Sequence, residues 1–220
     1  MSRRTESEGL FESFCASHGI PLTRVAVGSG RSPDYEVTIG GYMVVVEVKE
    51  IEPSDEERAA MERTAKGEIV VHRVTPGEKV RRKITSQAGQ IRSRTKGQAP
   101  GLLVLFDRAI MTRHLDPYQI RVAMEGFDTV VFAVPHDSRQ GVRRLGTKAG
   151  KRKKMTANDN TSISAISVLE QRADGRPELS IFHNRHASTP LDPGLFRPFG
   201  VKQYTLSHSE PGGIGEWTEI

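Results

Sequence analysis

Two acidic residues and a lysine, Asp34, Glu47 and Lys49, lie on a stretch of sequence that predicts a β-hairpin. A Gly-Gly turn signal separates residues 34–39 from the valine-rich segment 42–50. Counting back from this turn pairs Asp34 with Glu47 directly across the hairpin, and places Lys49 two residues further along the same face. The predicted register therefore brings two carboxylates and an amine into one small volume.

Two opposed carboxylates destabilise a hairpin unless a positive charge compensates them, and a divalent cation would do so. Mg²⁺ prefers oxygen ligands and commonly binds one or two carboxylates together with substrate phosphates. We therefore predict a Mg²⁺ site, with Mn²⁺ as the alternative ion, whose ligands are Asp34, Glu47 and the backbone carbonyl of Val48. Lys49 would orient the attacking water or stabilise negative charge on phosphorus. The plainer interpretation is that Lys49 only forms a cross-strand ion pair.

The middle of the chain is strongly basic. The whole sequence has a formal net charge of +5, but residues 71–154 carry 19 basic and 6 acidic side chains. Two stretches within this region, 79–96 and 138–154, contain no acidic residue. Such a surface is typical of proteins that bind polyanions, because ordinary surfaces mix their charges. The predicted nucleic-acid-binding residues are Arg81, Arg82, Lys83, Arg92, Arg94, Lys151, Arg152, Lys153 and Lys154.

Two other interpretations of these basic stretches stay open. One is a solvated face without a partner, and the other, for residues 151–154, is a nuclear-localisation signal. Aromatic residues make up only 6% of the chain, which argues against a base-stacking platform for single strands. Duplex or branched DNA is therefore the expected partner. Cutting two strands with one site per chain would suit a homodimer.

Helix and strand patterns alternate along the first two thirds of the chain, which predicts an α/β sheet. The valines of the segment 42–50 lie on both of its faces, so this strand should be an interior one. The last thirty residues lack periodicity and predict an irregular surface tail. Helices are expected over 7–18, 54–66, 79–95 and 116–126, and further strands over 68–74, 101–106, 129–134, 161–170 and 178–184.

Two polar residues on the predicted helices could reach the site. Glu8 lies at the edge of the apolar stripe of the first helix, whereas Glu12 points further toward solvent. Gln87 lies at the border of the stripe of the helix 79–95. The structural alternatives are that Glu8 only interacts favourably with the helix dipole, and that Gln87 is a polar residue at the helix border.

The sequence Pro33-Asp34 followed by Glu47-Val48-Lys49 resembles the signature of the PD-(D/E)XK nucleases. The resemblance covers about residues 6–134. It implies a restriction-endonuclease-like mixed β-sheet flanked by helices, in the order α-β-β-β-α-β, and Mg²⁺-dependent hydrolysis of phosphodiesters. It also implies that Asp34 and Glu47 are metal ligands and that Lys49 is the catalytic lysine.

Within this superfamily the pattern is most similar to that of the archaeal Holliday-junction resolvases. These carry an acidic residue early in the first helix, eleven residues before a helix-ending glycine, as Glu8 precedes Gly19 here. The resemblance therefore implies a catalytic role for Glu8. The Gln-x-x-x-Tyr pattern of exonuclease relatives is absent, because Ile91 follows Gln87 at that spacing. Gln87 stays a candidate catalytic residue because of its place on the helix.

These observations predict three parts: a nuclease-like core over 6–134, a basic flexible loop over 135–160, and C-terminal strands with an irregular tail over 161–220, packed on the core. The expected function is a Mg²⁺-dependent endonuclease that hydrolyses phosphodiester bonds of duplex or branched DNA. The alternative is a catalytically inactive nucleic-acid-binding module on the same fold. A weaker alternative is a protein whose basic stretches contact an acidic protein partner.

The sequence also predicts where the protein is found. No apolar run is long enough to span a membrane, and the first residues lack the apolar core of a signal peptide. The single cysteine, Cys15, excludes an internal disulfide and a cysteine-based zinc site. We therefore expect a cytoplasmic protein with no membrane partner.

Overall fold

A computed structural model describes residues 4–26, 32–71, 74–109, 114–136, 139, 141–208 and 215–220. In chain order the elements are α1 (Glu6–Ser17), β1 (Leu22–Arg24), β2 (Tyr35–Ile39), β3 (Tyr42–Ile51), α2 (Asp55–Ala65), α3 (Glu78–Thr95), β4 (Gly101–Asp107), α4 (Pro117–Glu125), β5 (Asp128–Ala133), β6 (Arg143–Ala149), β7 (Ala165–Gln171), β8 (Pro177–His183), two 3₁₀ turns (Pro193–Leu195 and Arg197–Phe199), β9 (Lys202–His208) and β10 (Gly215–Glu219).

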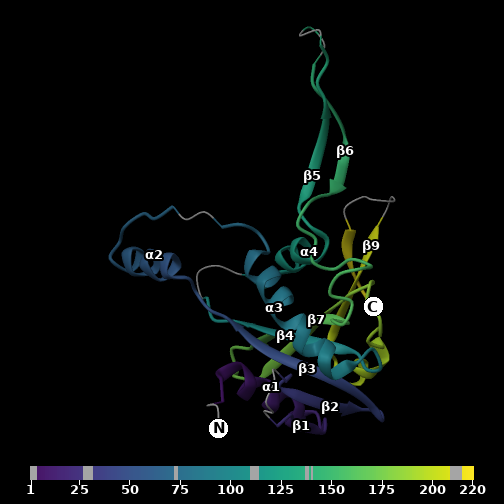
Figure 1. The fold of residues 1–220 in the computed structure, drawn as a ribbon. Helices are drawn as coiled ribbons and strands as arrows, with labels where there is room; N and C mark the ends of the chain where they lie inside the picture. Colours follow the sequence, from purple (N-terminus) through teal and green to yellow (C-terminus); the bar gives the residue numbers. More distant parts are fainter. Residues whose placement is uncertain are drawn as a thin grey trace.

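The centre of the fold is a mixed sheet of eight strands in the order β1-β2-β3-β4-β7-β8-β9-β10. Strands β3, β4 and β7 run parallel to one another, whereas β1, β2 and β3 are joined antiparallel. Helix α1 lies on one face of this sheet, and α3 and α4 lie on the other (Figure 1). Strands β5 and β6 form a separate two-stranded ribbon. The chain is thus a mixed α/β protein, as predicted.

The hairpin at the predicted site has the expected register. Tyr35 pairs with Val46, and Ile39 pairs with Tyr42 across the turn. Gly40 and Gly41 both have positive φ angles, 58° and 84°, which a two-residue turn with the twist of the strands requires. The turn chemistry therefore determines which residues face each other along the whole hairpin.

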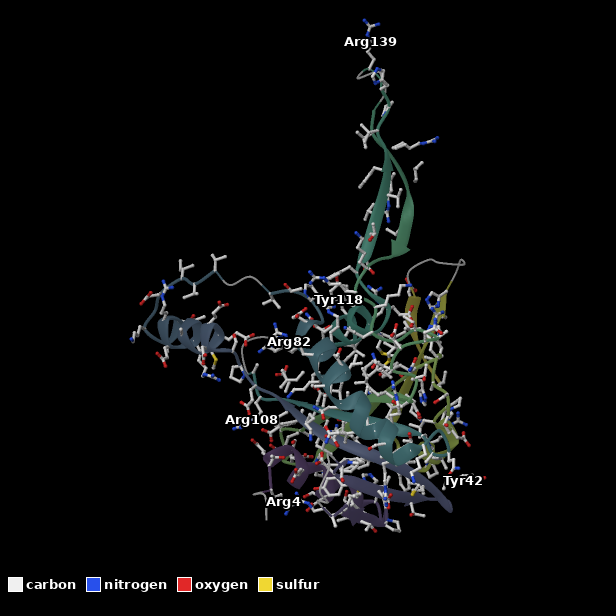
Figure 2. All side chains as sticks on the ribbon, in the orientation of Figure 1. Arg4, Tyr42, Arg82, Arg108, Tyr118 and Arg139 are labelled. Atoms are coloured by element: carbon white, nitrogen blue, oxygen red, sulfur yellow. The ribbon has the colours of Figure 1, made fainter. Side chains whose placement is uncertain are left out.

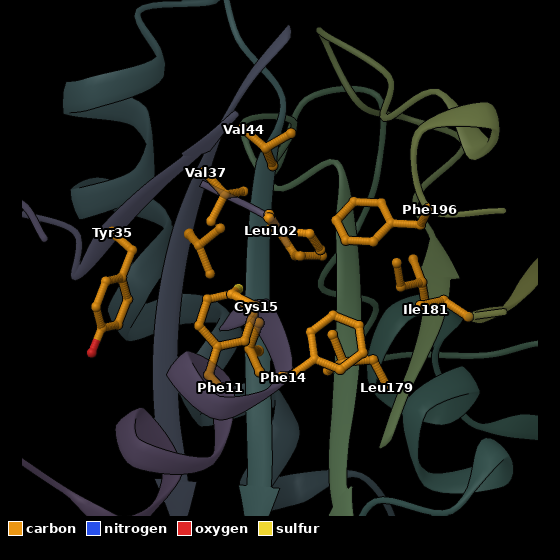
Figure 3. Close-up of a cluster of buried hydrophobic side chains, with 14 of the residues drawn as sticks. Phe11, Phe14, Cys15, Tyr35, Val37, Val44, Leu102, Leu179, Ile181 and Phe196 are labelled. Atoms are coloured by element: carbon orange, nitrogen blue, oxygen red, sulfur yellow. The ribbon is translucent and has the colours of Figure 1, made fainter. Parts of the chain in front are cut away.

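The alternation of side chains along β3 separates two cores. Val44, Val46 and Val48 point to the α1 face, where they pack with Phe11 and Phe14 (Figure 3). This cluster also contains Cys15, a buried free thiol, as expected for a small apolar residue. On the opposite face, the apolar stripe of α3 packs on β4 and on α4; its members are Val80, Ile84, Ala88 and Ile91. Glu47 and Lys49 therefore face α3.

Several expectations about local structure were wrong. Residues 68–71 and 74 form no strand, and the apolar side chains of Ile69 and Val71 are exposed, so this segment packs against no sheet. The region 135–160, predicted as a flexible loop, contains the strand β6, which pairs with β5. The last thirty residues are not irregular, since β9 and β10 pair with each other and extend the main sheet.

The predicted strands near 161–170 and 178–184 are confirmed as β7 and β8, which pair antiparallel. The short strand β1 was not predicted, because three residues with little apolar character give no periodic signal. In the described part of the chain, no helix has both the length and the apolar character needed to span a bilayer.

Two glycines test this packing. A Cβ at Gly101 would overlap Ile91 and the carbonyl oxygen of Ser162, so Gly101→Ala should destabilise the fold by at least the ~1–3 kcal/mol typical of overpacking. Gly89, in the exposed part of α3, has open space around it, so Gly89→Ala should stabilise the helix by about 1 kcal/mol. Thermal and urea unfolding of wild type and both variants measure these changes in the free energy of unfolding. Equal stabilities for the two would contradict the close contact between β4, α3 and Ser162.

Candidate active site

The structure brings Asp34, Glu47 and Lys49 together at the open end of the β2–β3 hairpin, where β2 no longer pairs with β3. The Nζ atom of Lys49 lies 3.0 Å from Oδ2 of Asp34 and 2.6 Å from Oε1 of Glu47. The Glu47 side chain is fully buried, while those of Asp34 and Lys49 are 18% and 27% exposed. The cluster is thus closed on the side of Glu47 and open to solvent on the side of Lys49 and Asp34.

Backbone hydrogen bonds fix the two carboxylates relative to each other. The backbone N–H of Asp34 donates to Oε2 of Glu47 at 3.2 Å, and the backbone N–H of Val48 donates to Oδ2 of Asp34 at 2.9 Å. The Asp34 carbonyl accepts a hydrogen bond from Val25 N, just beyond β1. These bonds form because β2 pairs with β3 only as far as Tyr35, which leaves the edge of β3 beyond it to the Asp34 side chain.

The carbonyl of Val48 points to the side of β3 that faces β2 and Asp34. Val45 and Ile51 make their backbone hydrogen bonds toward β4, so the odd-numbered residues of β3 use the β4 side. The N–H and C=O of a strand residue point to the same side. Since the N–H of Val48 donates to Asp34, its carbonyl also points toward the carboxylates. The three predicted metal ligands therefore share one edge of β3.

Burial and charge both change the acidity of this cluster. Burial, together with the nearby Asp34 charge, raises the pKa of Glu47 to about 7 against the opposing effect of Lys49. Burial by itself would lower the pKa of Lys49, but the charges of Glu47 and Asp34 outweigh it, so the Lys49 pKa is raised. Lys49 thus stays protonated, and its single ammonium group forms ion pairs with both carboxylates.

The residues present fit a hard divalent cation. With both carboxylates ionised, the cluster carries a net charge of −1, because a single ammonium contacts both of them. Carboxylate and carbonyl oxygens are the ligands that Mg²⁺ prefers. Among the described residues, no further acidic, histidine or cysteine side chain completes a group of three. Water and substrate oxygens would have to supply the remaining ligands.

Helix α3 presents a polar stripe to this cluster. The pKa of Lys83 is lowered, first by burial and then by the positive charge of Lys49. Gln87 follows one turn later and is half buried; its Nε2 donates to Ser86, and its Oε1 has no hydrogen-bond partner among the described residues. The Nε2 of Gln90 donates to the carbonyl of Ser32, two residues before Asp34, at 3.1 Å.

Gln90 was not predicted to have a role, although it ties α3 to the segment that carries Asp34. The available signal was the helical spacing of Lys83, Gln87, Gln90 and Arg94 along one side of α3. Arg94 forms an ion pair with Glu36, which lies on the same face of β2 as the site. The stripe therefore contacts the hairpin along much of the length of α3.

The contacts of Glu8 lie at the start of α1. Its carboxylate lies 2.7 Å from the Arg24 guanidinium, and it closes the capping box of α1 with Thr5. The start of this helix contacts the end of β3, because the backbone N–H of Ser7 donates to Glu50 at 2.9 Å. Among the described residues Glu8 does not form a group of three candidate metal ligands with Asp34 and Glu47, and its catalytic role stays a prediction. The Glu12 side chain is more exposed than that of Glu8, 27% against 10%, as predicted, although it also accepts a hydrogen bond from the buried Tyr35 hydroxyl at 2.7 Å.

Most of the predicted basic contacts are exposed, with one clear exception. Arg81 is buried; its guanidinium donates to the carbonyls of Pro76 and Val122 and stacks on Phe127, so it is not free to contact a nucleic acid. The sequence showed its charge but not the direction of its side chain. The predicted residues at the surface are Arg82, Arg92, Arg94, Lys151, Arg152 and Lys153, while Lys83 and Lys154 are half buried.

The two basic stretches meet at one groove. Arg82, Thr85 and Ser86 of α3 line a cavity of about 560 Å³ together with Arg152 and Lys154 from the segment after β6. Residues far apart in the sequence thus form one surface with a net positive charge, although Glu78 also lines it and pairs with Arg82 at 3.2 Å. Lys83 does not line this groove, since successive residues of a helix point in different directions.

No family model, curated protein or solved structure matches this chain. The geometry of the site is therefore the evidence for function.

The raised pKa of Glu47 makes stability depend on pH. The folded state holds this proton more tightly than the unfolded chain, whose pKa is near 4.5. The stabilisation is therefore complete below pH 4.5 and is lost as pH rises through about 7. Without divalent ions, wild type should lose roughly 3 kcal/mol relative to Glu47→Gln over this interval. Urea unfolding of both proteins across this pH range, in EDTA, measures the difference; a difference that does not change with pH would contradict the assignment.

Proposed function

We propose that this protein is a Mg²⁺-dependent nuclease that hydrolyses phosphodiester bonds in duplex or branched DNA, with Mn²⁺ as the alternative ion. The observation that carries the proposal is the cluster of Asp34, Glu47 and Lys49 at one solvent-accessible edge of the sheet. A carboxylate pair, a strand carbonyl and a protonated lysine together supply what metal-assisted phosphoryl transfer needs.

The order of elements supports the same proposal. Helix α1 is followed by three antiparallel strands, β1, β2 and β3, and then by α3 and the parallel strand β4. This is the α-β-β-β-α-β order implied by the resemblance to PD-(D/E)XK nucleases, with α2 as an addition. The hairpin β2–β3 carries the signature residues in that arrangement.

In this proposal Asp34, Glu47 and the Val48 carbonyl would hold the metal ion. When bound, Mg²⁺ would stabilise charge on the phosphate and make a bound water more acidic. The protonated Lys49 would donate a hydrogen bond to the attacking water or to a phosphate oxygen. Lys83 would add a second positive charge beside Lys49 and help to position the phosphate.

The basic surface would hold the rest of the nucleic acid. A polyanion backbone needs cations around a site that itself contains carboxylates. The groove with Arg82, Arg152 and Lys154 supplies them next to the helix α3 that covers the site. Phosphate contacts of this kind position a duplex without reading its sequence.

A binding module without catalysis is the second candidate. The observation that favours it is the position of the Lys49 ammonium, which contacts both carboxylates and could replace a metal ion there. Such a protein would bind DNA and leave it uncut. Cleavage assays distinguish the two candidates directly.

Removing one member of the cluster should abolish cleavage without unfolding the protein. Asp34→Ala and Lys49→Ala should each reduce Mg²⁺-dependent nicking of supercoiled plasmid by roughly 10²-fold or more, as expected when a group that stabilises the transition state is removed. Assays with linear duplex and four-way junctions define the preferred substrate. Circular dichroism and thermal melting verify that the variants fold.

Glu12→Gln is the matched control, because it neutralises a carboxylate on the opposite face while glutamine still accepts the Tyr35 hydrogen bond. This variant should cleave like wild type. Wild-type levels of Mg²⁺-dependent cleavage in both cluster variants would reject the assignment. DNA binding by wild type with no product in Mg²⁺ or Mn²⁺ would instead establish the binding module.

A further inference from the structure

The ribbon formed by β5 and β6 stands apart from the rest of the protein. It makes no strand pairing with the main sheet and projects away from it (Figure 1). Arg139 marks its far tip in Figure 2. A two-stranded hairpin by itself is at best marginally stable in water, because it has no second layer to bury its side chains against. A projecting ribbon of this kind is expected to function in contact with a partner.

The base of the ribbon is firmly attached. Arg121 of α4 donates two hydrogen bonds, at 2.7 and 2.6 Å, to the carboxylate of Asp128, the first residue of β5. On the other strand, Gly150 N donates to the carbonyl of Phe127, and Phe127 N donates to the carbonyl of Lys151. The ribbon therefore has a defined direction relative to α4 and the basic groove.

One face of the ribbon is apolar and exposed. Val130, Phe132 and Val134 alternate along one side of the chain, so they share a face, and they are 43%, 54% and 76% exposed. Val142 and Leu145 on the returning strand are also more than half exposed. Arg144 pairs with Phe132 across the ribbon and shares its face, whereas Arg143 pairs with Ala133 and lies on the other face. A register shift between Val131 and Phe132 leaves Leu145 without a pairing partner on β5.

The charge of the ribbon shows which partner it suits. Arg143 and Arg144 have no ion pair within the described residues, whereas Asp128 is neutralised by Arg121. The segment directly after the ribbon adds the cations of residues 151–154. Two copies of the chain that met through this face would place their unpaired arginines against each other, which costs energy. A polyanion complements the same surface.

We propose that the β5–β6 ribbon lies in the major groove of duplex DNA, with the face that carries Phe132 toward the groove. The long side chains of Arg144, on that face, and Arg143, on the other, would reach the flanking phosphates. The inference rests on the proposed function. The major groove of B-DNA is about 12 Å wide and admits a two-stranded β-ribbon. The six residues of β5 span roughly 20 Å, about two thirds of a helical turn. The apolar side chains would contact thymine methyl groups and sugars.

Binding measurements in EDTA with uncut duplex DNA test this inference separately from catalysis. Arg143→Ala/Arg144→Ala should lower the slope of log affinity against log salt by about 1.8, the value for two lost phosphate contacts. Phe132→Ser should weaken binding and leave this slope unchanged. The matched control is Arg172→Ala/Arg176→Ala, which removes the same charge from the exposed turn between β7 and β8 and should keep the wild-type slope.

Each outcome has one meaning. If wild type binds duplex DNA and the ribbon double variant keeps the slope of the control, the inference about the ribbon fails and the nuclease proposal stands. If wild type binds no duplex DNA at any salt concentration, both fail. If sedimentation shows a dimer that Phe132→Ser dissociates, the ribbon contacts a second copy, and the inference is wrong.

Discussion

The arrangement of the site depends on the burial of one carboxylate beside another. Glu47 is fully buried in β3, and Asp34 lies just beyond the end of β2, where the ladder leaves space for its side chain. Two carboxylates with one ammonium carry a net negative charge in a partly desolvated place. The pKa of Glu47 is raised because burial and the Asp34 charge destabilise its ionised form. A divalent cation would relieve this destabilisation, and the proposed phosphodiester chemistry rests on this electrostatic demand.

The rest of the molecule supports this cluster from two sides. Helix α1 and its core close the far face of the sheet, so β3 has little freedom to move. Helix α3 covers the near face and contributes Lys83, and Gln90 holds the segment before Asp34 in place. The same helix borders the groove with Arg82 and Arg152. One helix therefore links the acidic cluster with the basic surface.

The sequence was sufficient to predict the hairpin and its cluster, because a two-residue glycine turn determines every pair that follows it. It was less informative where side-chain direction decides the outcome. Arg81 contributes to the charge count, but it is buried against Phe127. The strands β6 and β10 were missed because glycines and charged residues obscure their alternation. Strand β9 was missed because it offers only Tyr204 and Leu206 as alternating apolar residues, and pairing with its neighbours defines it.

Isothermal titration calorimetry with Mn²⁺ near pH 7, in buffers of different ionisation enthalpy, tests the central claim most directly. Wild type should bind about one ion per chain and release part of a proton, because Glu47 must ionise to bind the metal. Asp34→Asn should bind much more weakly, and Glu47→Gln should release no proton. If wild type takes up no Mn²⁺ with or without DNA, or if both variants bind it as wild type does, these carboxylates do not form a metal site and the account fails.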